Sequence, residues 1–138
     1  MSIPDPAASA TPRPNALSIV VADMAAALAF YRRCGLTFDD GAESAPHAQA
    51  QVGDFAIMFD TQEVARSIDP EWTPGTGGPQ MSLAFACTDP AAVDAIHADL
   101  VAAGYQSELK PFDAFWGQRY AKVRDPDNNT VDFYSALT

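Results

Sequence analysis

The sequence predicts an α+β fold in which two consecutive βαβββ modules form curved mixed sheets around a cleft. A chain of 138 residues suffices for one domain with its own core. The same order of elements occurs twice: a strand, a helix that starts at Asp and stops at Gly, a second strand and a hairpin. One helix covers only one face of a four-stranded sheet, so the opposite faces are left to form a cleft.

The first module is predicted from alternation and helix-capping signals. Leu17, Ile19 and Val21 alternate along a strand and are expected to face the helix that follows. Asp23 is typical of a helix N-cap, and Gly35 suits the left-handed residue just past a helix end. The predicted strand, helix, short strand, loop and hairpin occupy residues 16–21, 24–33, 36–38, 39–46 and 47–59.

The second module repeats these signals. Asp89 and Pro90 are typical of the N-cap and first position of a helix, and Gly104 follows its end. The sequence KPFDAFWG at 110–117 is predicted as a loop, and DPDNN at 125–129 as a tight turn. The predicted strands occupy residues 81–87, 105–109, 118–124 and 130–134, and the predicted helix occupies residues 90–103.

Composition divides the chain into four segments. Its first residues are rich in Pro, Ala and Ser and contain no continuous apolar stretch, which predicts a flexible tail on a cytoplasmic protein. A second stretch, rich in Pro and Gly, separates the modules. The two cysteines, Cys34 and Cys87, are expected to be reduced thiols. The tail, first module, linker and second module are predicted at residues 1–14, 15–60, 61–80 and 81–138.

The charge of the chain excludes two classes of partner. Eight Lys and Arg residues against 18 Asp and Glu residues give a formal net charge of −10, and there is no basic run. Proteins that bind phosphate backbones or anionic lipid need the opposite charge, so neither nucleic acid nor a membrane is expected as a partner. The acidity instead favours a neutral or cationic ligand.

Three segments together resemble a known family. They are ADMAAALAFYRRCGLTF at 22–38, SLAFACTDPAAVDAIHADLVAAG at 82–104 and RDPDNNTVDFY at 124–134. Their order and spacing are similar to those of the vicinal oxygen chelate superfamily, which includes glyoxalase I, extradiol dioxygenases, fosfomycin-inactivating enzymes and bleomycin-binding resistance proteins. The resemblance covers residues 16–136. It implies the glyoxalase/bleomycin-resistance fold, often completed in a homodimer, with one divalent metal in the cleft of catalytic members.

Most positions that hold the metal ligands of that family lack a metal-binding side chain here. The resemblance implies a His or Gln on the first strand of each module and a Glu on its fourth strand. With the helix-facing residues assigned by alternation, these positions fall at Ala16, Met58, Ser82 and Asp132. Only Asp132 carries the expected kind of donor, so no metal cofactor is predicted, and a divalent metal is kept as the alternative. His47 and His97 are expected to be ordinary surface or half-buried histidines.

Aromatic residues are the other candidates for the cleft. In this fold the linker and the loop at 110–117 border the cleft mouth, where flat rings suit flat or hydrophobic ligands. The alternative is that these rings fill the end of the cleft or pack in a dimer interface. Asp132 is the only candidate for a catalytic base. The predicted ligand-binding residues are Met58, Trp72, Ser82, Phe112, Phe115, Trp116 and Asp132.

Three functions remain open on this basis. The favoured one is a metal-independent protein, like the bleomycin-resistance branch, that binds a small hydrophobic, aromatic or cationic molecule such as an antibiotic or other natural product. The second is a metal-dependent lyase, isomerase or dioxygenase that uses Asp132. The third is a non-catalytic interaction module whose cleft is filled by its own side chains. The resemblance also implies a homodimer.

Overall fold

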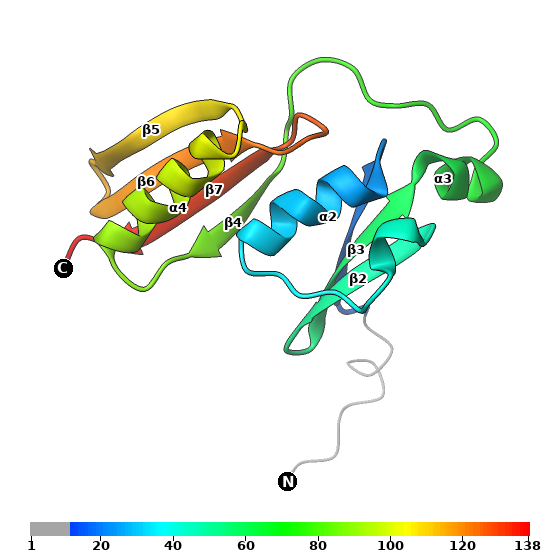
Figure 1. Ribbon diagram of the computed structural model, residues 1–138, viewed down its shortest axis with the longest axis horizontal. Coiled ribbons are helices and arrows are strands. Elements are labelled where there is room, and N and C mark those ends of the chain that lie inside the picture. Colours follow the sequence, from blue (N-terminus) through cyan, green and yellow to red (C-terminus); the bar gives the residue numbers. More distant parts are fainter. Residues whose placement is uncertain (1–11) are drawn as a thin grey trace, which may run out of the picture.

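The computed structural model describes residues 12–138 and contains two modules in the predicted sequence order (Figure 1). The first contains β1 (Ala16–Val21), α2 (Met24–Arg33), a short 3-10 helix η1 (Ala42–Ser44), β2 (His47–Val52), β3 (Phe55–Thr61) and α3 (Gln62–Ile68). The second contains β4 (Ser82–Ala86), α4 (Pro90–Ala102), β5 (Ser107–Ala114), β6 (Gln118–Arg124) and β7 (Thr130–Ala136). Of the tail predicted at residues 1–14, residues 1–11 lie outside the described part of the chain. No helix in the described range is both long and apolar enough to cross a membrane.

Each module forms one mixed sheet, which confirms the predicted α+β class. The N-terminal sheet has the strand order β1-β3-β2, with β1 parallel and β2 antiparallel to β3. The C-terminal sheet has the order β4-β7-β6-β5, with β4 parallel to β7 and the other neighbours antiparallel. Figure 1 shows the two sheets side by side, with the segment after α3 arching across the molecule to reach β4. The described strands do not close into a barrel.

The N-terminal sheet has three strands because residues 36–38 do not form the predicted strand. Leu36 is buried in the core, and the ring of Phe38 packs edge-on against Phe59 with a centroid distance of 5.5 Å. Leu36 is thus buried and Phe38 half-buried, and both side chains reach the core from an irregular segment that follows α2. A short apolar run needs burial, and tertiary packing supplies it here without strand pairing.

Two segments predicted to be irregular are partly regular. The linker predicted at 61–80 begins with α3, because the hydroxyl of Thr61 accepts the Val64 N–H at 3.3 Å and caps the helix. The prediction of a loop at 110–117 is wrong, because β5 continues to Ala114 and only a turn separates it from β6. Two register shifts between β5 and β6 disturb the alternation that would have identified this strand.

One core joins the two modules. Phe30 of α2 is fully buried, and its ring packs edge-on against Tyr31 and against Tyr105 of the second module, with centroids 4.9 Å apart in each pair. At the surface of the same junction, Arg33 on α2 pairs with Asp99 on α4 at 3.1 Å. The helix-covered faces of both sheets contribute to a single hydrophobic cluster. The opposite sheet faces are therefore the ones available to carry a site.

A buried carboxylate fixes the DPDNN turn against the first module. Asp125 Oδ1 accepts the backbone N–H groups of Asp127 (2.9 Å) and Asn129 (2.8 Å). Its Oδ2 accepts Asn129 Nδ2 (3.0 Å) and the hydroxyl of Tyr31 on α2 (2.7 Å). Burial, followed by the charge of Asp125, raises the pKa of Tyr31, so this hydroxyl remains a donor. Hydrogen bonds from both modules thus hold the turn.

Candidate functional site

The candidate site begins on the open face of the C-terminal sheet, which is the face opposite α4. On β7, Val131 and Phe133 are buried in the core, so Asp132 projects from the opposite face in the orientation that alternation predicts. Lys122 on β6 lies directly across from Asp132, and Ala84 on β4 flanks it on the other side. Asp132 is thus central on this face.

Asp132 is held by two side chains of the neighbouring strand β6. The hydroxyl of Tyr120 donates a hydrogen bond to Oδ2, and Lys122 Nζ lies 3.3 Å from Oδ1. Burial, followed by the hydrogen bond to Asp132, raises the pKa of Tyr120, so its hydroxyl stays protonated at neutral pH. Oδ1 is buried and accepts no hydrogen bond from the described residues, although the ammonium group is within ion-pair distance. One acceptor of this carboxylate is therefore incompletely satisfied.

Phe112, Trp116 and Tyr120 continue this face beyond Asp132 and are termed the aromatic cluster. The ring centroids of Phe112 and Tyr120 are 6.0 Å apart, and those of Trp116 and Tyr120 are 5.4 Å apart. Trp116 is 49% exposed, although its indole N–H donates to Gln118 Oε1 at 2.7 Å. Phe115 lies in the turn between β5 and β6 and is 98% exposed. Of the three rings of the cluster, it packs only against Trp116, in an edge-on contact. The cluster offers accessible ring surface next to a carboxylate.

Ser82 belongs to the same face, whereas Met58 and Trp72 do not. Ser82 shares a hydrogen bond with Thr130 and, together with Lys122, lines an open hollow of about 580 Å³. Met58 projects from the N-terminal sheet, on the side opposite its buried strand neighbours. Trp72 lines a separate pocket beside the DPDNN turn. Of the predicted binding residues, Ser82, Phe112 and Asp132 thus lie on one sheet face. Trp116 joins them from the turn between β5 and β6, where its ring packs against Tyr120.

The side chains at the positions of the family's metal ligands do not fit a divalent metal. Ala16 and Met58 have no oxygen or nitrogen donor, and the hydroxyl of Ser82 is bonded to another hydroxyl. Asp132 has an ammonium group beside one oxygen and the hydroxyl of Tyr120 on the other. Nowhere between residues 12 and 138 do three or more His, Cys, Asp or Glu side chains gather to share an ion. One carboxylate is a weak ligand set for such a cation.

The N-terminal sheet carries a second polar group that the sequence analysis does not predict. His47 Nδ1 lies 2.6 Å from Asp60 Oδ1, and Ser18 Oγ donates to Asp60 Oδ2 at 3.2 Å. Asp60 is on the central strand β3, and its two partners come from the strands on either side. The hydrogen bond to Asp60 raises the pKa of His47. His97, in contrast, bonds Ser107 at 2.7 Å, and burial lowers its pKa.

His47→Gln is expected to destabilise the protein at acidic pH and to have little effect at alkaline pH. Because the partner Asp60 raises the pKa of His47, folding favours the protonated imidazole. This stabilisation is complete below the pKa of an unfolded histidine, about 6.5, and is lost as pH rises through the higher pKa of the folded protein. The imidazole is 43% exposed, so the effect should stay below about 1 kcal/mol. Urea denaturation of both proteins at about pH 5 and about pH 9 measures it, and equal differences at the two pH values would exclude the ion pair.

Comparison with known proteins supports the same architecture. Residues 13–133 match the family described as the Glyoxalase/Bleomycin resistance protein/Dioxygenase superfamily. No curated protein sequence matches the chain. Among solved structures, a glyoxalase/bleomycin resistance protein/dioxygenase family enzyme from Burkholderia phytofirmans PsJN is 22% identical with a TM-score of 0.78, covering 89% of this chain and 98% of that one.

Two further solved structures share the fold at similar distance. A glyoxalase-related enzyme from Fulvimarina pelagi is 18% identical with a TM-score of 0.76, over 91% of this chain and 88% of that one. Lactoylglutathione lyase from Agrobacterium tumefaciens is 21% identical with a TM-score of 0.64, over 91% of this chain and 94% of that one. At these identities the likeness concerns the fold, while the activity depends on the side chains of each site.

Proposed function

We propose that this chain, which belongs to the glyoxalase/bleomycin resistance protein/dioxygenase superfamily, binds a small molecule on the open face of its C-terminal sheet without a metal. The observation that carries the proposal is the pairing of Asp132 with Tyr120 and Lys122 beside the aromatic cluster. The ammonium group of Lys122 balances the charge of the carboxylate, so this pair does not need a metal ion. What remains available to a ligand is ring surface and one incompletely satisfied acceptor.

The aromatic cluster supports a flat, largely apolar ligand. Phe112 and Trp116 are 37% and 49% exposed, and their ring planes are at 90° to each other, so a planar ring that stacks on one and contacts the edge of the other removes apolar surface from water. The hydrogen bond from the Trp116 indole to Gln118 orients this ring before a ligand arrives. An oriented side chain loses little freedom on binding, which favours affinity.

Asp132 supports a ligand that also carries a cationic amine. Its Oδ1 lies next to Lys122 but accepts no hydrogen bond from the described part of the chain. A ligand ammonium can displace the flexible lysine side chain and donate the missing hydrogen bond, which is strong because both groups are charged. The formal net charge of −10 also attracts cations to the protein.

Binding without conversion would serve to sequester a compound, and the resemblance to the bleomycin-resistance branch supports an antibiotic or other natural product as that compound. A homodimer is part of the same proposal. Phe115 supports it, because its ring is 98% exposed and adjoins the exposed ring of Trp116, so that the two form a continuous apolar surface that a second molecule can cover. Analytical ultracentrifugation of the intact chain distinguishes the dimer from a monomer.

Trp116→Leu is expected to weaken the binding of 2-naphthylmethylammonium by about tenfold or more, because it removes the most exposed ring of the aromatic cluster. This probe combines a flat apolar ring with a cationic amine. Isothermal titration calorimetry measures the affinity. Trp72→Leu is the matched control, since Trp72 lies in a different pocket, and it should leave the affinity unchanged. An equal loss in both variants would contradict the proposed site.

Lys122→Met serves as the second arm of this experiment. It removes the ammonium group that competes for Asp132, so the affinity for 2-naphthylmethylammonium should increase. The neutral probe 2-naphthylmethanol has the same ring without the charge, and its affinity should not increase. If neither probe binds saturably to the parent protein, or if Lys122→Met affects both probes equally, the proposal is wrong.

A further inference from the structure

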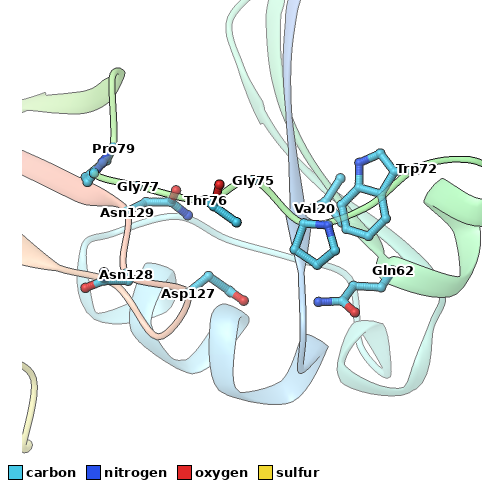
Figure 2. Close-up of a pocket in the computed structure, with 12 residues that line it drawn as sticks. Val20, Gln62, Trp72, Gly75, Thr76, Gly77, Pro79, Asp127, Asn128 and Asn129 are labelled. Atoms are coloured by element: carbon cyan, nitrogen blue, oxygen red, sulfur yellow. The ribbon is translucent and has the colours of Figure 1, made fainter.

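A second pocket, of about 420 Å³, lies where the linker passes the DPDNN turn (Figure 2). Trp72 and Gln62 stand on one side of it and Asp127 and Asn128 on the other, with the backbone of residues 75–78 crossing between them. These residues come from the first module, the linker and the second module. The pocket has none of the residues of the aromatic cluster and is a separate site.

The carboxylate of Asp127 is only half satisfied. Its Oδ1 accepts the Ala22 N–H at 2.8 Å, whereas its Oδ2 is buried and has no hydrogen-bond partner among residues 12–138. Burial raises the pKa of this carboxyl, and the charges of Asp125 and Asp23 act in the same direction. The ionised form therefore lacks compensation by positive charge. If the Asp127 side chain turned so that Oδ2 faced the pocket, a protonated amine there would supply both the charge and the missing hydrogen bond.

The rest of the lining is uncharged and combines polar groups with the apolar side chains of Val20, Trp72, Pro74 and Pro79. Gln62, Thr76 and Asn128 provide amide and hydroxyl groups, and glycines of the linker provide accessible backbone. None of the described residues that line the pocket is a Lys or Arg. Arg66 lies nearby on α3, with its guanidinium 5.4 Å from the centroid of the Trp72 ring and a hydrogen bond of 3.3 Å to Gln62. Neutral donors and acceptors of this kind suit ligand hydroxyl groups.

We propose that this pocket binds an amino sugar, that is, a hydroxylated ring with a protonated amine. Asp127 holds the ammonium group, the amides and the linker backbone hold the hydroxyl groups, and the apolar C–H face of the sugar ring packs on Trp72. Arg66, next to Trp72, repels the amine from that side and so orients it toward Asp127. This site goes beyond the flat apolar ligand proposed above.

Asp127→Asn is expected to weaken glucosamine binding by about tenfold or more, because it removes the charge but keeps an acceptor for the Ala22 N–H. The measurement uses a Trp116→Phe background, in which Trp72 is the remaining tryptophan and reports on the pocket by fluorescence. At about pH 6.5 the sugar amine is protonated. Asp40→Asn, at an exposed carboxylate outside the pocket, is the matched control and should bind as the background does.

Two neutral sugars separate charge recognition from ring recognition. N-acetylglucosamine keeps the ring but has no positive charge, and glucose lacks the nitrogen, so both should bind about tenfold more weakly. Amide chemical shifts of residues 75–78 give a second readout of the location. The proposal is overturned if glucosamine does not bind saturably, if the neutral sugars bind equally well, or if Asp127→Asn has no effect. These measurements use neither the naphthyl probes nor Trp116, so their failure is distinguishable from that of the aromatic-cluster site.

Discussion

Asp125→Ala is expected to lower the free energy of unfolding by about 3–5 kcal/mol. The buried carboxylate accepts four hydrogen bonds, three from the DPDNN turn and one from Tyr31 of the other module. Alanine removes both acceptor oxygens and with them all four hydrogen bonds. It also leaves the buried hydroxyl of Tyr31 and the N–H groups of the turn without their partner, and such groups are costly away from water.

Urea denaturation followed by circular dichroism measures this loss. Tyr31→Phe removes only one of the four hydrogen bonds and should cost about 1–2 kcal/mol. Asp40→Ala, the same substitution at an exposed carboxylate, should stay within about 0.5 kcal/mol of the parent. If Asp125→Ala were no more destabilising than Tyr31→Phe, the turn would not depend on its carboxylate.

Phe30→Ala is expected to destabilise the protein by about 3–5 kcal/mol. Its ring is fully buried and packs edge-on against Tyr31 and Tyr105, with centroids 4.9 Å apart in each pair. Truncation leaves a cavity at the junction of the two modules, because neither neighbouring ring can move into the space without losing its own contacts.

Thermal and urea denaturation of Phe30→Ala measure this effect. The matched control is Phe115→Ala, which removes the same atoms from a side chain that is 98% exposed and should change the free energy of unfolding by less than about 0.5 kcal/mol. Similar destabilisation by the two substitutions would mean that the Phe30 ring does not join the modules.

Features that depend on neighbouring residues in the sequence were predictable. Val131 and Phe133 are buried and Asp132 faces the other way, because side chains alternate along any strand. The helix starts were predictable for a similar reason. Asp23 and Asp89 accept first-turn N–H groups at 3.1 and 2.8 Å, and this capping needs no distant partner.

To predict which side chains pair across neighbouring strands, the register of the strands must be known as well as the alternation within each strand. The turn at 53–54 fixes the β2–β3 hairpin so that His47 lies opposite Asp60, but alternation alone did not predict this pair. The position of Trp72 and Asp127 on one pocket had no local signal. It depends on how a long connection crosses a distant turn, which local propensity does not determine.

The DPDNN turn also makes the two halves of the internal repeat interdependent. Asp125 accepts a hydrogen bond from the hydroxyl of Tyr31, and Asp127 accepts one from the N–H of Ala22, so both carboxylates of the turn are tied to groups of the first half. A ligand held by Asp127 would therefore bind only when the halves are assembled. By mass action, the free energy needed to separate the two halves would therefore increase with the concentration of this ligand.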